Sequence, residues 1–101
     1  MSFSLSSENI RFDEPNLLAE CQTVDGDWKS SSLNLNDGIA NINGVLEWRH
    51  GGNFMASSQD YNLHGVILTC KSQTVDGYWV DANINLDVGV TNENGVLKFH
   101  F

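Results

Sequence analysis

Two carboxylates, Asp25 and Asp76, are by residue type the best candidates for catalysis in this chain. A pair of carboxyl groups on either side of a glycosidic bond can hydrolyse it. Both aspartates, however, precede a glycine and occupy equivalent places in an internal repeat, and equivalent places in pseudo-symmetric halves tend to lie far apart. We therefore interpret them as turn residues, expect no catalytic residues, and rank a small hydrolase last among the possible functions.

Metal and cofactor chemistry has less support still. His50, His64 and His100 have no cluster of Cys, Asp or Glu around them at the spacing of a zinc site. The segment from Asn34 to Gly38 is the nearest approach to a calcium loop, but it lacks the alternating ligands and the closing glutamate. Phosphate-binding and dinucleotide-binding motifs are missing as well. The sequence therefore predicts no metal and no cofactor.

Cys21 and Cys70 are the only cysteines in the chain. They have no CxxC partner, which argues against a metal site or a redox pair. Two interpretations remain: two small apolar side chains in the core, where free cysteines usually lie, or a Cys21–Cys70 disulfide. We expect the first and keep the disulfide as the alternative.

The charge of the chain limits the kinds of partner it can have. Its 101 residues carry a net charge of −8, with only five Lys and Arg. Nucleic acids and anionic membrane surfaces both require basic residues, so we expect neither as a partner. No apolar run is long enough to span a membrane, and Met1–Ser6 lacks the basic and apolar regions of a secretory signal. These features favour a cytoplasmic protein.

An internal repeat sets the positions of all these residues. Four segments of the first copy recur in the second: Thr23–Trp28 as Thr74–Trp79, Leu33–Leu35 as Ile84–Leu86, Asn41–Trp48 as Asn92–Phe99, and Leu17–Cys21 as Val66–Cys70. The last match gives the second copy about two extra residues between Cys70 and Thr74. The repeats span about 2–48 and 53–101. One copy is too small to be stable alone, so we expect residues 1–101 to form a single domain with a shared core.

Each copy is predicted to contain the same short elements. Asp-Gly and Asn-Gly dipeptides mark tight turns, because glycine accepts positive φ without steric cost. The predicted strands are residues 17–22, 28–35, 66–71 and 79–86, and period-two alternation also follows each Asn-Gly turn. Ser7 and Ser58 could cap short helical turns, and the glycine-rich joint Arg49–Asn53 is expected to be flexible. The fold class is therefore all-β with short helical turns.

The three tryptophans, Trp28, Trp48 and Trp79, fall within the apolar pattern of the repeats. An exposed indole could stack on a sugar ring, but a core position is more common for so large an apolar side chain. We expect all three to pack in the core.

The doubled motifs resemble those of the cyanovirin-N homology domain. The resemblance is carried by the strand end Leu33–Asn36, the Asn-x-Asn-Gly-x-Leu hairpins that begin at Asn41 and Asn92, and the junction from Trp48 to Phe54. It extends over Ser2 to Phe101. It implies one elongated, pseudo-symmetric domain with a sugar site at each end, and the small size of each copy leads us to expect that the two repeats are intertwined. It also implies terminal α(1→2)-linked mannose as the ligand, and hence mannose-containing oligosaccharides or glycoproteins as partners.

The same resemblance bears on assembly and on the cysteines. Members of the family swap halves between chains, so we expect a protein that is mostly monomeric and able to form a domain-swapped dimer. The family's founding member closes each half with a disulfide. The matching positions here are Ser7 with Cys21 and Ser58 with Cys70, so neither bridge can form, and this suits a reducing compartment.

Carried over position by position, the resemblance implies two sugar-binding sites made of turns. The first site comprises Ser2, Ser6, Gln22, Val24, Asp25, Asn92, Glu93 and Asn94. The second comprises Asn41, Ile42, Asn43, Asn53, Ser57, Lys71, Ser72, Gln73 and Asp76. Ala40 and Ala56 stand where the founding member has glutamates at the second site, and Leu5 replaces a glutamine at the first. We therefore expect tighter binding at the first site. The alternative is a domain of the same fold whose sugar sites have decayed, leaving a structural or protein-interaction module.

Overall fold

The computed structural model describes residues 2–101 as a series of short elements that occurs twice. The first repeat contains η1 (Phe3–Ser6), β1 (Ser7–Asp13), β2 (Asn16–Gln22), β3 (Trp28–Asn34), η2 (Leu35–Asp37), β4 (Ile39–Ile42) and β5 (Val45–Trp48). The second contains η3 (Phe54–Ser57), β6 (Ser58–His64), β7 (Ile67–Gln73), β8 (Trp79–Asn85), α1 (Leu86–Gly89), β9 (Val90–Glu93) and β10 (Val96–Phe99). None of the helical segments in residues 2–101 is long and apolar enough to cross a membrane.

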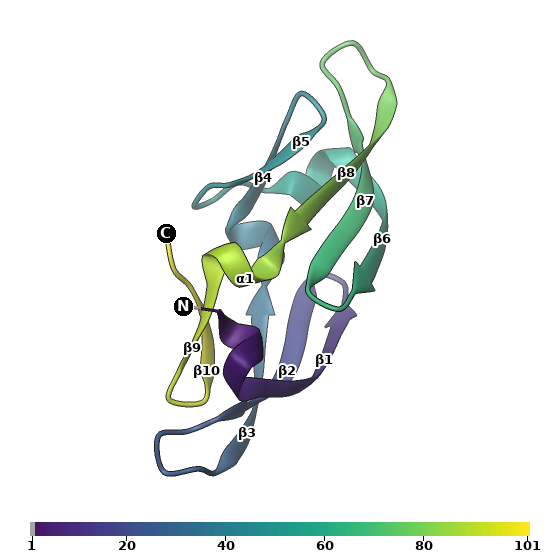
Figure 1. The fold of residues 1–101 in the computed structure, drawn as a ribbon. Helices are drawn as coiled ribbons and strands as arrows, with labels where there is room; N and C mark the ends of the chain where they lie inside the picture. Colours follow the sequence, from purple (N-terminus) through teal and green to yellow (C-terminus); the bar gives the residue numbers. More distant parts are fainter. Residues whose placement is uncertain (1) are drawn as a thin grey trace.

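Each repeat contributes a three-stranded sheet and a separate hairpin. The sheets have the orders β1-β2-β3 and β6-β7-β8, the hairpins are β4-β5 and β9-β10, and all pairs are antiparallel. The hairpin of each repeat packs against the sheet of the other, β10 on β3 and β5 on β8 (Figure 1). The molecule measures 50 × 22 × 16 Å. The predicted fold class, all-β with short helical turns in two intertwined repeats, is confirmed.

The register of the strands corrects the predicted insertion. Ser7 pairs with Cys21 in the first sheet, and Ser58 pairs with Ser72 in the second, so both partners lie 51 residues further along the chain. The two repeats are therefore equivalent at one constant offset, and the two extra residues before Thr74 are an error of the sequence alignment. Cys70 corresponds to Ala19, and the true equivalent of Cys21 is Ser72.

Two strands and the position of the helical turns were also mispredicted. Ser7 and Ser58 do not precede helical turns; they begin β1 and β6, and the 3-10 turns η1 and η3 end just before them. Strands β1 and β6 lack a clean alternation because Asn9 and Asp60 have positive φ and shift the strand register. Such a bulge removes the periodicity by which a strand is recognised.

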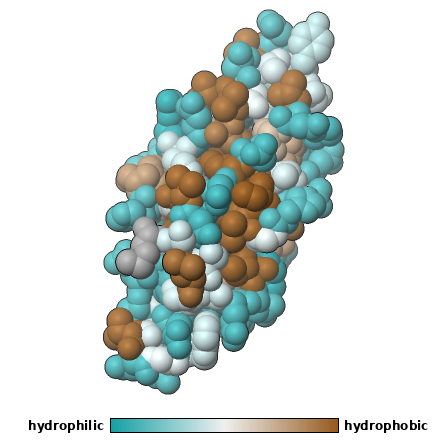
Figure 2. All heavy atoms as spheres, in the orientation of Figure 1, coloured by the Kyte–Doolittle hydropathy of each residue, from teal (hydrophilic) through white to brown (hydrophobic). Residues whose placement is uncertain are grey.

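Both repeats contribute to one apolar core. Phe3 and Phe54, equivalent residues of η1 and η3, are fully buried, as are Leu17 on β2 and Leu68 on β7. All four belong to a single cluster of buried side chains. On the face drawn in Figure 2, apolar residues are most frequent along the middle of the molecule. Neither sheet could bury its apolar face without the other repeat's hairpin, which explains why the repeats are intertwined.

Only one tryptophan lies where the sequence analysis expected it. Trp48 packs against the core, with its ring centroid 6.4 Å from that of Phe99. Trp28 and Trp79 are 47% and 44% exposed, so their assignment to the core is wrong. They form the last strand pairs of their sheets, next to the Asp-Gly turns, where the sheet ends and has fewer neighbours to cover an indole.

The joint between the repeats is fixed by hydrogen bonds, in contrast to the flexible segment expected from its composition. The N–H of Gly51 donates to the Asp37 carbonyl at 2.7 Å, and the N–H of Asn53 donates to the Asn36 carbonyl at 2.9 Å. The Asn36 side-chain amide also donates to Asn53 Oδ1 at 2.7 Å. The joint therefore lies against the turn at η2.

Both cysteines are free in the structure and enclosed by the core. Cys21 is 0% and Cys70 4% exposed, and burial raises the pKa of the Cys70 thiol. A thiol reagent needs an accessible thiolate, so we expect slow labelling of the native protein and rapid labelling of two thiols in denaturant. Mass spectrometry of the unreduced protein counts the labels added under native and denaturing conditions. An unlabelled mass 2 Da below the value for two free thiols would indicate a Cys21–Cys70 bridge and would contradict the assignment.

Tyr61 makes stability depend on alkaline pH. Its hydroxyl donates to the Ser58 carbonyl at 2.8 Å, and burial, followed by the Glu14 carboxylate and Cys70, raises its pKa to about 12. Because the unfolded pKa is about 10, this proton stabilises the folded state below pH ~10, and that contribution is lost as pH rises toward ~12. Urea unfolding at several alkaline pH values should therefore show a smaller fall for Tyr61→Phe than for the parent. Tyr78→Phe, at an exposed tyrosine, is the control and should behave like the parent.

Candidate functional site

At one end of the molecule, the side chain of Asn92 ties three elements together. Its Nδ2 donates to Ser6 Oγ at 2.9 Å, to the Ser6 carbonyl at 3.3 Å and to the Gln22 carbonyl at 2.9 Å. Its Oδ1 accepts from the Gly95 N–H at 2.8 Å. The β9–β10 hairpin, η1 and the end of β2 are therefore held in one fixed arrangement.

The turn between β2 and β3 is fixed against the same hairpin. The N–H of Val24 donates to Asn94 Oδ1 at 3.0 Å. Within the turn, the Thr23 hydroxyl accepts from the Asp27 N–H at 3.1 Å, and the Gly26 N–H donates to the Thr23 carbonyl at 3.0 Å. The exposed turn thus has its conformation before any ligand arrives.

The opposite end repeats this arrangement at the constant offset. Asn41 Nδ2 donates to Ser57 Oγ at 2.9 Å and to the Gln73 carbonyl at 2.9 Å, and its Oδ1 accepts from the Gly44 N–H at 2.8 Å. The N–H of Val75 donates to Asn43 Oδ1 at 3.0 Å. We call these two arrangements hairpin–turn site 1, around Asn92, and hairpin–turn site 2, around Asn41.

Hairpin–turn site 1 gathers the residues assigned to the first sugar site. Ser6, Gln22, Val24, Asn92 and Asn94 are joined by the hydrogen bonds above. Among the remaining assigned residues, Ser2 directly precedes η1 without a side-chain capping bond, Asp25 is exposed in the β2–β3 turn, and Glu93 is exposed at the hairpin end, 4.0 Å from Lys98 Nζ.

Hairpin–turn site 2 gathers only part of its assigned set. Four of those residues, Asn41, Asn43, Ser57 and Gln73, belong to the hydrogen-bonded arrangement itself. Three more are exposed: Ile42 on the hairpin, Asp76 in the β7–β8 turn, and Asn53 at the start of η3, where its side chain bonds to Asn36.

Two residues assigned to the second site lie elsewhere. Ser72 is fully buried, and its hydroxyl is 3.0 Å from that of Ser58. Lys71 forms an ion pair with Asp81 on β8. Both were included because of the mistaken two-residue insertion. At the constant offset, the counterparts of Gln22, Val24 and Asp25 are Gln73, Val75 and Asp76.

Comparison with known proteins identifies the family. The sequence profile of the CVNH domain matches residues 3–98. The chain belongs to the cyanovirin-N homology family. It is 39% identical to a cyanovirin-N homolog of Tuber borchii, covering 98% of this chain and 99% of that protein.

Two similar solved structures contain saccharides. The microvirin:mannobiose complex is 35% identical, with a TM-score of 0.83 and 98% of both chains covered. A MoCVNH3 variant in complex with (N-GlcNAc)4 is 25% identical, with a TM-score of 0.92 over 97% of this chain and 96% of that one. The resemblance inferred from the repeated motifs is confirmed, and the chain has a carbohydrate-binding fold of a lectin family.

The two sites of this CVNH chain differ at their rims. Site 1 has Glu93 on the hairpin and Asp27 after its Asp-Gly turn, where site 2 has Ile42 and Tyr78. Tyr78 is 71% exposed, and the sequence analysis missed it because the Asp-Gly motif beside it is common to both turns. The sequence signal that could have identified Tyr78 is its replacement of Asp27 in two turns that otherwise match. Site 1 is therefore the more acidic and site 2 the more apolar.

The geometry gives little support to other chemistry. Asp25 and Asp76 lie in turns at opposite ends of the molecule (Figure 1), so they cannot flank one bond. Within residues 2–101, no three His, Cys, Asp or Glu side chains are placed to hold a metal ion.

Proposed function

We propose that the chain is a non-enzymatic lectin that binds mannose-type glycans, ending in α(1→2)-linked mannose, at both hairpin–turn sites. The observation that carries this proposal is the duplicated set of asparagine hydrogen bonds, which holds polar groups of a hairpin and a turn in place at each end. A preformed site loses less conformational entropy on binding. The mannobiose complex of microvirin supports the choice of ligand.

Recognition at site 1 would rest on hydrogen bonds between vicinal sugar hydroxyls and the exposed groups of the turn and hairpin. The Asp25 and Glu93 carboxylates accept, and the Asn94 amide nitrogen donates. Site 2 offers Asp76 and Asn43 for the same purpose, and Tyr78 offers an aromatic face. We expect tighter binding at site 1, because it has more hydrogen-bonding groups for a neutral polyol.

A titration of the ¹⁵N-labelled protein with α(1→2)-mannobiose tests the proposal. We expect saturable shifts of the Val24 and Asn94 amides at lower ligand concentration than those of Val75 and Asn43, unchanged by a chelator. A reversed order would overturn the ranking of the sites. If none of these amides responds at millimolar ligand while the protein remains folded, the domain is a structural or protein-interaction module. Titration with (N-GlcNAc)4 at the same concentrations tests whether the response depends on mannose.

We infer that the protein acts as a monomer in a reducing compartment such as the cytoplasm. The fixed joint at Gly51 and Asn53 supports the monomer because it directs the second repeat back onto the first. The free, buried cysteines support the compartment.

A further inference from the structure

One hydrogen bond between hairpin and sheet is present in only one repeat. Where β10 crosses β3, the N–H of Leu97 donates to Ser31 Oγ at 2.9 Å. The equivalent crossing of β5 over β8 places Leu46 against Ala82, at the constant offset. A methyl group cannot accept a hydrogen bond. Among residues 2–101, the Leu46 N–H donates to no acceptor on another element.

The unmatched N–H belongs to a residue that is largely enclosed. Leu46 is 7% exposed, and it faces Asn41 across the hairpin, as Leu97 faces Asn92. Buried backbone N–H groups without a partner are rare, because each costs the free energy of desolvation. A ligand or water acceptor at this point would remove that cost.

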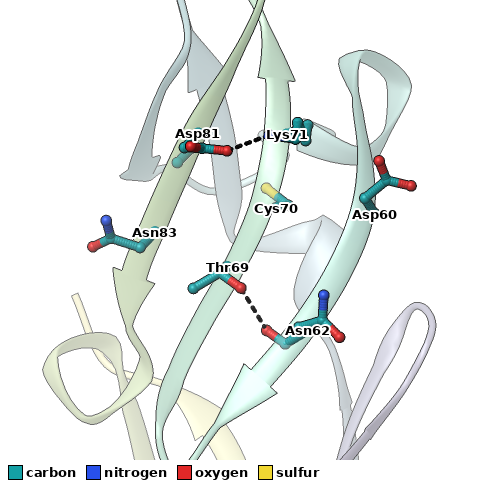
Figure 3. Close-up of a pocket in the computed structure, with 8 residues that line it drawn as sticks. Asp60, Asn62, Thr69, Cys70, Lys71, Asp81 and Asn83 are labelled. Atoms are coloured by element: carbon teal, nitrogen blue, oxygen red, sulfur yellow. Dashed lines mark hydrogen bonds and ion pairs between the residues drawn. The ribbon is translucent and has the colours of Figure 1, made fainter.

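Leu46 lines a hollow between its hairpin and β8. A space of about 210 Å³ is bounded by Gly44–Leu46 on the hairpin and by Asp81–Asn83 on β8. The same three β8 residues bound a second space of about 300 Å³ across β6, β7 and β8. Figure 3 shows its polar side chains, including Asp60, Asn62, Lys71 and Asn83. Both spaces are bounded by Asp81–Asn83, and we call the two together the β8 groove; the smaller one also borders hairpin–turn site 2 at Gly44.

The charges of the β8 groove select a neutral ligand. The carboxylates of Asp60 and Asp81 disfavour an anion, and Lys71 is already paired with Asp81 at 2.5 Å. The backbone N–H of Leu46 requires an acceptor, which excludes a simple cation at that point. The ligand must therefore present a strong neutral acceptor next to groups that donate to carboxylate and carboxamide oxygens.

We propose that the β8 groove is a third binding site, which takes a neutral acetamido sugar. The acetamido carbonyl accepts from Leu46 N–H, and the sugar N–H and hydroxyls donate to Asp81 and Asn83. A sugar that carries only hydroxyl groups offers a weaker acceptor to the Leu46 N–H, and it lacks the amide N–H that donates to Asp81 or Asn83. In the first repeat the Ser31 hydroxyl already accepts from the equivalent N–H of Leu97, so the site exists only once. It does not depend on binding at either hairpin–turn site.

The test is an amide-shift titration with N,N′-diacetylchitobiose. We expect saturable shifts of Leu46 and Asn83 in the parent protein. Ala82→Ser restores the hydroxyl found in the first repeat, so it should protect the Leu46 N–H from exchange and weaken chitobiose binding about fivefold or more. Ser31→Ala is the matched control: it should expose the Leu97 N–H and leave the Leu46 response unchanged.

Three outcomes would overturn the proposal. The first is no response of Leu46 at millimolar chitobiose, which means that water alone fills the groove. The second is binding that Ala82→Ser leaves unaltered. The third is an equal response of the Asn83 amide to α(1→2)-mannobiose, which has no acetamido group. The Val24, Asn94 and Val75 amides, which do not bound the β8 groove, report the hairpin–turn sites in the same spectra, so the two proposals can fail independently.

Discussion

Replacing Gly52 with alanine should destabilise the protein by about 3 kcal/mol or more, the upper range for an overpacked site. A Cβ at this position would lie 2.4 Å from the carbonyl oxygen of Ile39 and 2.7 Å from the nitrogen of Ala40. Both contacts are with backbone atoms, so no side-chain rotation can relieve them. The joint would have to move away from β4, breaking the hydrogen bonds that Gly51 and Asn53 make to the η2 turn.

The neighbouring glycine provides the matched control. Gly51 has φ of +73°, and a Cβ on it would meet no other atom within 4 Å, so Gly51→Ala should cost only about 1 kcal/mol of backbone strain. Urea unfolding compares the two variants, and size-exclusion chromatography at several concentrations follows their assembly. We expect the parent to be a monomer and Gly52→Ala to populate a half-exchanged dimer, because a joint that cannot close favours exchange. Equal stability of the two variants would contradict the steric argument.

Asn92→Ala should both destabilise the fold, by about 2–3 kcal/mol, and remove binding at hairpin–turn site 1. The substitution deletes a partly buried amide that donates to Ser6 and Gln22 and accepts from Gly95, and it leaves those groups without partners. The hairpin would lose its fixed position, so mannobiose affinity at site 1 should fall more than tenfold. Asn41→Ala should do the same at site 2 and leave site 1 intact.

Asp25→Ala separates binding from stability at site 1. Asp25 is exposed at the turn, and its side chain makes no hydrogen bond among the described residues. Its loss should leave the free energy of unfolding within about 0.5 kcal/mol of the parent and weaken mannobiose binding several-fold. Full binding by the folded Asn92→Ala variant would show that the asparagine does not organise the site.

Local turn chemistry made much of the fold predictable. The Asn43-Gly44 and Asn94-Gly95 turns have positive φ at both central residues, as this dipeptide favours in a two-residue hairpin. Their repetition in the sequence was enough to indicate two similar halves. The intertwining of the repeats was inferred from the small size of each copy, and the pairing of each hairpin with the opposite sheet could not be read from the pattern, because it depends on contacts between distant residues.

The errors in the candidate site arose where local similarity was misleading. Cys70 was aligned with Cys21 because the residue types match, whereas the strand register pairs Ser72 with Ser58. That shift brought the buried Ser72 and the ion-paired Lys71 into the second site. The sequence could not show that the Leu46 N–H lacks a partner. The difference between Ser31 and Ala82 matters only because each lies where a hairpin of the other repeat crosses its strand.

The exchange of hairpins also dictates when the chain can finish folding. The sheet β1-β2-β3 is complete once Asn34 has been synthesised, but the hairpin that covers it ends at Phe99, and the bond from Val24 to Asn94 joins residues 70 apart. Contacts of such long range form slowly, because a large loop must close before they contribute. On the ribosome, which adds about 5–20 residues per second, the first sheet must wait for several seconds with its apolar face uncovered. This interval, before the C-terminal hairpin emerges, is when the nascent chain is most exposed to aggregation and most in need of a chaperone.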